Sequence, residues 1–369
     1  MNFGLIFGRA ARHTTAVLLA VAGLALLAPH AGAQPAKAPI RLNVGNATVS
    51  TPPYAAYNTS VPQTIFFAEE GLDVRMVGMG GATVATQALA AGQVDIALPA
   101  SSAPLALLDR IPDADIVAFY TFINGFQSVP MVLQDSPIKT VAELAGKTVG
   151  VQTLGNSQVQ TTKALVKIAG GDPASVRFVA VGEGIEAAHA LASKRIDALV
   201  LFDGLYGQIE AAGTPLRALD SAATQRDAVG FTGVVITRPS FLKEHRDVLV
   251  RYGRAVAKAT LFAKTNPEAA VRMHWKIYPE TRPRGMREEE ALRSSMASLK
   301  ARLDNLYPVD SLYGGATARQ IAGYIELNKA GGQLASTVAV GRLWDPSLLK
   351  DINDFDQEAV RRRALAWKP

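Results

Sequence analysis

The chain has 369 residues, of which 49% are hydrophobic, and its formal net charge is +6. This length suits an export signal followed by two domains of ordinary size. A charge this mild, with no basic cluster interleaved with aromatic residues, predicts no nucleic-acid partner. The sequence contains no cysteine, which excludes disulfide bonds, thiol catalysis and a lipid-anchored cysteine.

The first 33 residues are typical of a signal peptide. Arg9 and Arg12 give a positive start, residues 16–28 form an apolar core, and residues 31–33 (Ala-Gly-Ala) fit a cleavage site. The apolar core is too short to be a permanent membrane helix. We therefore expect export to the periplasm of a Gram-negative cell and no stable membrane insertion after cleavage. Losing both arginines would reduce the net charge from +6 to +4.

The segment after the signal peptide predicts alternating strands and helices. The glycines of residues 78–81 form a tight turn between a strand and a helix, and Gly92 ends that helix in a left-handed conformation. Ser101 and Pro104 begin the next helix, with the serine as its cap. The predicted strands are 41–46, 72–77, 94–98 and 115–121, and an additional helix is predicted at 57–68.

The second half continues the same alternation and then becomes helical. Asn266 and Pro267 predict the cap and first turn of one of the later helices. The predicted strands are 129–134, 148–152, 176–181, 196–202, 216–219 and 231–237. The predicted helices are 139–147, 157–169, 206–212, 247–265, 287–303 and 317–329.

A short pattern occurs twice, 102 residues apart. Residues 88–90 (Ala-Leu-Ala) are followed after three residues by Val94-Asp95, and residues 190–192 (Ala-Leu-Ala) by Ile196-Asp197. Each copy places an alanine-rich helix end, a turn, an aspartate and an apolar strand in the same order. The repeat predicts two α/β lobes of similar build, each with a mostly parallel sheet.

Five segments in order resemble the periplasmic substrate-binding proteins of ABC importers, in the sulfonate/nitrate/thiamine-precursor-like group. They are EEGLDVRMV, GMGGAT, ALAAGQVDIAL, PIKTVAELAGKTVGVQT and the stretch from Arg238 to Ala270. The resemblance implies the type II periplasmic-binding-protein fold, with a ligand held in a cleft between two lobes. It further implies a first lobe of residues 34–130 and 236–369 with C-terminal helices, and a second lobe of residues 131–235. Two crossing strands, 129–134 and 229–237, would join them, and the region after Thr281 falls outside the resemblance.

Polar residues and glycines at the predicted strand ends are the candidate ligand-binding residues, because open parallel sheets bind ligands beyond the carboxyl ends of their strands. Several precede helices, whose free N–H groups suit an anionic part of a ligand. Ser101, Asn156 and Ser157 have capping of their own helices as the alternative role. The candidates are Thr48, Ser50, Tyr54, Gly80, Gly81, Ser101, Ser102, Tyr120, Asn124, Gly155, Asn156, Ser157, Glu183 and Asp203.

The sequence gives little support to catalysis. His189, His245 and His274 stand alone on predicted helices, without partners at metal-ligand spacing, so we interpret them as surface or packing residues. Asp95 and Asp197 begin strands and are expected to cap turns. We therefore predict a protein that is not an enzyme and that needs no metal or cofactor.

The predicted strand ends contain no Lys or Arg, and Glu183 and Asp203 are their charged members. A neutral or zwitterionic organic ligand (a sulfonate, an aromatic acid or a pyrimidine) fits this charge pattern better than an inorganic anion. The leading hypothesis is a monomeric solute receptor that delivers its ligand to an importer permease and ATPase. The alternatives are a periplasmic sensor for a membrane kinase and an enzyme resembling the thiamine-pyrimidine synthases.

Overall fold

The computed structural model describes residues 38–49, 51–155, 157–219 and 228–369. The predicted signal peptide, Ser50 and Asn156 therefore lie outside the described residues. In the described part of the chain, no helix is both long enough and apolar enough to span a membrane.

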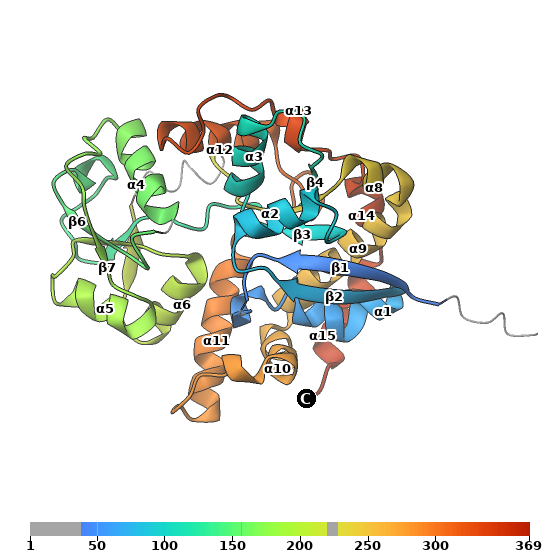
Figure 1. Cartoon of the computed structure of the whole chain (residues 1–369). Coiled ribbons are helices and arrows are strands. Elements are labelled where there is room, and N and C mark those ends of the chain that lie inside the picture. Colours follow the sequence, from blue (N-terminus) through green and yellow to red (C-terminus); the bar gives the residue numbers. More distant parts are fainter. Residues whose placement is uncertain (1–37, 50, 156, 220–227) are drawn as a thin grey trace, which may run out of the picture. The chain divides into compact units, whose positions relative to one another are not determined.

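Two five-stranded sheets with the same topology organise the chain (Figure 1). Their strand orders are β2-β1-β3-β10-β4 and β7-β6-β8-β5-β9. In both, the first three strands are parallel and the fourth is antiparallel to its neighbours. The first sheet contains β1 (Ile40–Asn46), β2 (Leu72–Gly78), β3 (Ile96–Leu98), β4 (Val117–Ile123) and β10 (Gly233–Thr237). The second contains β5 (Met131–Leu133), β6 (Thr148–Val151), β7 (Arg177–Ala180), β8 (Ala198–Val200) and β9 (Leu216–Ala218).

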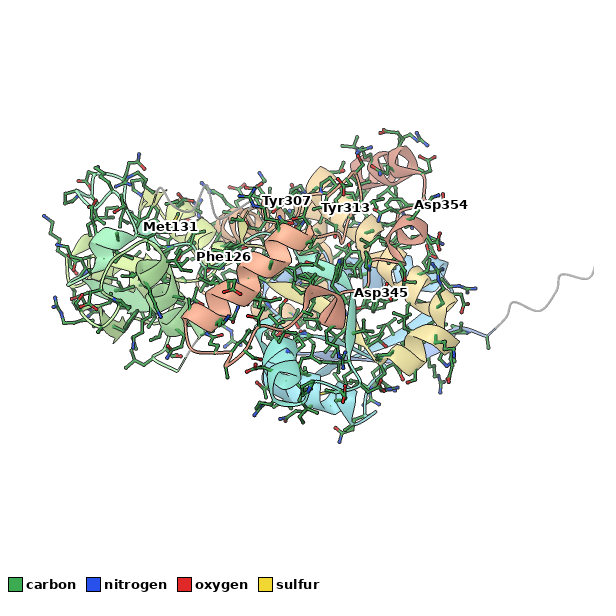
Figure 2. The ribbon with its side chains drawn as sticks, turned by 90° about the horizontal axis from the view of Figure 1, so that it is seen from above. Phe126, Met131, Tyr307, Tyr313, Asp345 and Asp354 are labelled. Atoms are coloured by element: carbon green, nitrogen blue, oxygen red, sulfur yellow. The ribbon has the colours of Figure 1, made fainter. Side chains whose placement is uncertain are left out.

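The antiparallel strand of each sheet comes directly after a crossing between the sheets. The chain leaves the first sheet at β4, passes Phe126 and enters the second sheet at Met131 in β5; both residues are labelled in Figure 2. It returns after β9 and enters the first sheet again as β10, whose five residues are all buried. The predicted crossings at 129–134 and 229–237 are thus confirmed.

Helices connect the parallel strands and make up most of the chain after β10 (Figure 1). The longest, α9, buries a continuous stripe that includes Leu249 and Phe262. Between the strands lie α1 (Phe67–Glu69), α2 (Ala82–Ala90), α3 (Ser102–Arg110), α4 (Ser157–Ile168), α5 (Gly184–Ala192) and α6 (Asp203–Ala211). After β10 come α8 (Pro239–Glu244), α9 (Arg246–Thr265), α10 (Pro267–Ile277), α11 (Glu288–Leu303), α12 (Ala318–Ala330), α13 (Val340–Leu343), α14 (Leu349–Ile352) and α15 (Gln357–Ala366). Short 3-10 turns are η1 (Pro53–Ala55), η3 (Ala142–Leu144) and η4 (Pro279–Thr281), and η2 (Pro62–Phe66) is a π-helix.

Most predicted elements are confirmed, and the main differences concern three predicted helices, of which 139–147 is reduced to the 3-10 turn η3. Gly92 has a φ of +73° after α2, and the Asn266 side chain accepts from the N–H of Ala269 at the start of α10, both as predicted. The predicted helix at 57–68 is instead a set of turns, the π-helix η2 and the short α1. In η2 the N–H of Phe67 bonds to the carbonyl of Pro62, five residues back. Helix α6 begins at Asp203, three residues earlier than predicted.

The repeated aspartates fix equivalent strands in the two sheets. The Asp95 carboxylate accepts from the N–H of Asn43 at 2.9 Å, and the Asp197 carboxylate accepts from the N–H of Thr148 at 2.8 Å. Each aspartate also donates its own N–H to the carbonyl of the same partner residue. Each aspartate therefore joins the residue before β3 or β8 to the neighbouring strand β1 or β6. The role is structural, but the carboxylates bind a neighbouring strand and do not cap a turn as predicted.

Replacing either aspartate by alanine is expected to lower the free energy of unfolding by about 1 kcal/mol, because one hydrogen bond to a backbone N–H is lost. Chemical denaturation of Asp95→Ala and Asp197→Ala measures this change. Asp73→Ala is the control, since that side chain is 56% exposed and forms a surface ion pair with Arg41. Equal stability of all three variants would contradict the assigned role.

Candidate functional site

The glycine turn after β2 leaves open space at the edge of the first sheet. Gly80 and Gly81 have φ values of +68° and +150°, backbone conformations that residues other than glycine rarely adopt. A Cβ atom built on Gly81 would meet nothing within 4 Å. Backbone groups are therefore accessible at this strand end, as the sequence predicts.

The strand-end edges of the two sheets meet at Tyr54. This residue belongs to the loop after β1, yet its ring packs on Gly204 in the first turn of α6, where an added Cβ would lie 2.5 Å from Cδ1 of the ring. Burial raises the pKa of Tyr54; Arg302 lowers it, and the carboxylates of Asp203 and Glu183 raise it further. Tyr54 follows β1 and Gly204 follows β8 of the second sheet, so the ends of these two strands lie close together in space.

A buried ion pair lies behind Tyr54. Arg302 of α11 donates from Nε to both carboxylate oxygens of Asp203 at 2.8 Å, and its Nη2 lies 2.7 Å from Oδ1. The two side chains are only 5% and 8% exposed. The same guanidinium donates to the side chain of Gln127 in the crossing segment, and it lies 4.7 Å from the centre of the Tyr54 ring.

The charges and hydrogen bonds of this pair are mutually satisfied. Burial alone would lower the pKa of Arg302, but the adjacent Asp203 carboxylate raises it above its ordinary value. Asp203 also accepts from the side chain of Asn305 at 2.9 Å and from the N–H of Gly204 at 2.7 Å. With these partners the carboxylate is occupied inside the protein, and it positions the start of α6 against α11.

Arg302 was not among the predicted site residues, because it lies beyond the region of resemblance. One sequence signal could have identified it. Ala291, Ser295, Ser298 and Arg302 follow one another at helical spacing, and all are buried. An arginine on a stripe of small residues has room to lie against a neighbouring helix, here α6, where Gly207 packs on the carbonyl of Ala297.

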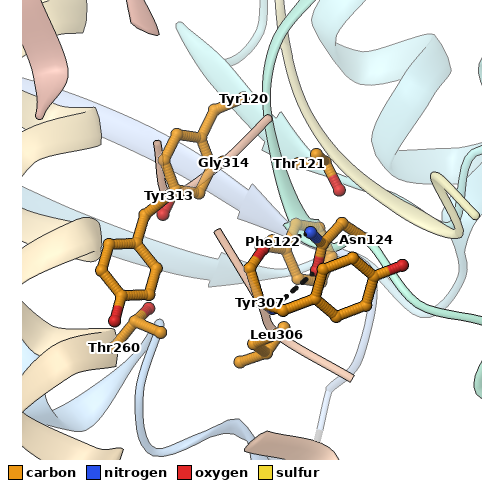
Figure 3. Close-up of a pocket in the computed structure, with 9 residues that line it drawn as sticks. All are labelled: Tyr120, Thr121, Phe122, Asn124, Thr260, Leu306, Tyr307, Tyr313 and Gly314. Atoms are coloured by element: carbon orange, nitrogen blue, oxygen red, sulfur yellow. Dashed lines mark hydrogen bonds between the residues drawn. The ribbon is translucent and has the colours of Figure 1, made fainter. Parts of the chain in front are cut away.

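Tyr120 and Asn124 belong to a separate cavity of about 10 Å³, shown in Figure 3. That volume is close to the space needed by a single water molecule, so no organic ligand fits there. The Asn124 side chain both donates to the carbonyl and accepts from the N–H of Tyr307 (dashed line in Figure 3). Burial strongly raises the pKa of Tyr120, which is 2% exposed.

Ser101 does not cap its helix. Its φ and ψ of −64° and −21° are helical, whereas a capping serine has an extended backbone from which its side chain can reach the next turn. The side chain is fully buried, and among the described residues its Oγ has no hydrogen-bond partner. The Oγ1 of Thr121, on the neighbouring β4, is in the same situation.

The remaining candidates are accessible. Thr48, Gly80, Gly155, Ser157 and Glu183 are exposed. Gly81 and Ser102 are half-buried, and Ser102 lies within hydrogen-bonding reach of Tyr324. The Glu183 carboxylate accepts from the side chain of Gln152 at the end of β6. These groups occupy the ends of parallel strands in both sheets.

His274 has structural partners, whereas His189 and His245 are exposed. His274 is fully buried, where its Nε2 donates to the carbonyl of Thr51 at 2.8 Å and its Nδ1 lies 3.1 Å from the Ser60 hydroxyl. Burial lowers the pKa of His274 to about 4. Across the described ranges, no group of three or more His, Cys, Asp or Glu side chains is arranged to hold a metal ion.

A family model described as NMT1/THI5 like matches residues 61–270, which is more than half of the chain. The chain belongs to the NMT1/THI5-like family. The matched region contains the glycine turn, both crossings and the whole second sheet. The family match thus covers the ends of β2 and β3 and of the strands in the second sheet, but not β1 with its following residue Tyr54, nor α11, which carries Arg302.

A relative of this NMT1/THI5-like chain is the formylaminopyrimidine-binding protein of Halalkalibacterium halodurans. It is 28% identical over 211 residues, which are 56% of this chain and 61% of that protein. The aligned region therefore spans less than two thirds of the relative.

Two solved structures share the fold of the chain. The periplasmic aliphatic sulphonate binding protein SsuA from Escherichia coli matches with a TM-score of 0.58 at 17% identity, covering 84% of this chain and 93% of SsuA. The desulfurization enzyme DSZB matches with a TM-score of 0.51 at 15% identity, covering 85% of this chain and 98% of DSZB. The predicted fold class, two mixed sheets flanked by helices in the periplasmic-binding-protein arrangement, is confirmed.

Proposed function

We propose that this protein is a solute receptor that binds a small organic molecule between the strand-end edges of its two sheets and delivers it to an ABC importer. The meeting of both edges around Tyr54 is the observation that carries the proposal, because a ligand held there would contact residues from both sheets. The names of a pyrimidine-binding relative and a sulphonate-binding structural neighbour agree with it.

The accessible candidates would form the site. Thr48, Gly80 and Gly81 approach the ligand from the first sheet, and Ser157 and Glu183 from the second. Three further candidates would lie behind the site and support it, because hydrogen bonds or burial already hold their side chains in place: Asp203, Asn124 and Tyr120. Ser101 would contact the ligand only after a local shift, because it is fully buried here.

The charge of the site favours an organic ligand over an inorganic anion. The strand ends contain no Lys or Arg, and the nearby Arg302 is already bound to Asp203. We infer binding rather than catalysis, since His274, Asp95 and Asp197 all have structural partners. The same proposal includes the lobe boundaries at 130/131 and 235/236, the periplasmic location, the monomeric state and the permease and ATPase partners.

The first test is a melting-temperature screen of the mature protein against aliphatic sulfonates, aromatic carboxylates and formylaminopyrimidines. A true ligand at 100 times its dissociation constant should add about 2.7 kcal/mol to stability and raise Tm. Glu183→Gln, which keeps the shape of the side chain but removes its charge, should weaken binding of a ligand that donates an N–H to this carboxylate, such as a formylaminopyrimidine, roughly 5- to 150-fold in calorimetry.

Glu210→Gln is the matched control, because Glu210 is exposed near the far end of α6. It should bind the ligand as the parent does. A screen with no stabilising compound would contradict the receptor function, and unchanged affinity in Glu183→Gln would remove Glu183 from the site. Ligand-dependent uptake with a reconstituted permease and ATPase separates an importer receptor from a sensor.

A further inference from the structure

Exposed apolar side chains lie at equivalent places in the two sheets. The strands β1 and β6 both occupy the second position in their sheet order. β1 ends at Asn46 and β6 at Val151, and the third residue after each is a large apolar one, Val49 and Leu154. Each of these apolar residues directly follows a threonine, so one loop contains Thr-Val and the other Thr-Leu.

These side chains are unusually open to solvent. Val49 is 77% exposed and Leu154 is 58% exposed. A single exposed apolar residue needs no explanation, but the same feature at matching strand ends of two sheets does. Val84, in the first turn of α2 after the glycine turn, is also 48% exposed, and a Cβ on Gly80 would lie 3.9 Å from Val49.

The two loops belong to edges that face each other. Tyr54, in the continuation of the Val49 loop, contacts the second sheet at Gly204 and lies within electrostatic reach of Glu183. Gln152, two residues before Leu154, donates to Glu183. Val49 and Leu154 therefore belong to the loops that carry Tyr54 and Gln152.

We propose that Val49 and Leu154 form an apolar clamp, and that the ligand carries an apolar body, a ring or an alkyl chain, which the clamp covers. This inference rests on the proposed receptor function and specifies its ligand class. Small hydrophilic molecules with the same polar head would leave both side chains exposed to water. The lack of Lys and Arg at the strand ends agrees with an apolar ligand body, because affinity then has to come from apolar contact rather than from charge pairing.

The test compares matched compounds that share a head group and differ in their apolar body. The pairs are methanesulfonate with hexanesulfonate, glycolate with benzoate, and formamide with a formylaminopyrimidine. Melting temperature and calorimetry are measured for the parent, Val49→Ser, Leu154→Ser and the control Ile168→Ser, whose side chain is 61% exposed at the end of α4.

We expect the larger member of at least one pair to bind, and each clamp variant to weaken that binding about tenfold, since a buried Val or Leu side chain contributes on this scale. Ile168→Ser should leave it unchanged. Two results would overturn the clamp while leaving a receptor function intact. One is binding of the small members alone. The other is a clamp variant that weakens binding of both members of a pair equally, which would indicate that the two side chains meet each other when the sheets approach. Binding of no compound would overturn both the clamp and the receptor function.

Discussion

Replacing Arg302 by methionine is expected to lower the free energy of unfolding by about 3 to 5 kcal/mol, because the Asp203 carboxylate would remain buried without its cation. The Asp203 side chain is only 8% exposed, and it makes an ion pair and short hydrogen bonds with Arg302. The Asn305 side chain cannot replace the lost charge. Chemical denaturation of the purified variant measures the effect, with circular dichroism as the check on folding.

Two comparisons separate the buried charge from a general loss of contacts. Arg246 lies 2.7 Å from Asp351, but both side chains are 48% exposed, so Arg246→Met should cost about 0 to 1 kcal/mol. The double variant Asp203→Leu/Arg302→Met removes both charges and should regain much of the lost stability. A double variant as unstable as Arg302→Met would show that packing between α6 and α11, rather than the buried charge, is the main loss.

The two sheets could be predicted because their signals are local. Alternating apolar segments, glycine turns and the repeated Asp95 and Asp197 all lie within short stretches of chain, and the structure places both aspartates at the same corner of their sheets. Local patterns do not predict which side chain fills a distant gap. Asp203 and Arg302 are separated by 99 residues, and nothing near either residue specifies the other.

The hydrogen-bond partners of the candidate site residues could not be predicted from the sequence, for two physical reasons. The Asn124 side chain binds the backbone of Tyr307, and backbone partners leave no trace in residue identity. Ser101 looked like a helix cap, but the tight entry into α3 gives it a helical backbone conformation. A sequence pattern places such residues at strand ends, whereas burial and hydrogen bonding decide what they do there.

Acidification should destabilise the protein through His274. Burial lowers the pKa of this residue from an ordinary value of 6.5 to about 4. Between these two values the unfolded chain binds more protons than the folded chain, so the free energy of unfolding rises with pH in this window. Stability is therefore lost as the pH falls from about 6.5 towards 4, by about 3 kcal/mol in full.

The variant His274→Gln isolates this contribution. A glutamine amide can still donate towards the carbonyl of Thr51 and accept from Ser60, but it does not titrate. Denaturation at pH 7.5, 6.5, 5.5 and 4.5 should show the stability difference between the parent and His274→Gln shrinking as the pH falls. Exposed carboxylates such as Glu288, whose pKa is lowered mainly by its hydrogen bond from Arg272, titrate in both proteins and cancel in the difference. A difference that stays constant with pH would mean that His274 becomes protonated without cost in the folded state. In that case burial could not be holding the ring neutral.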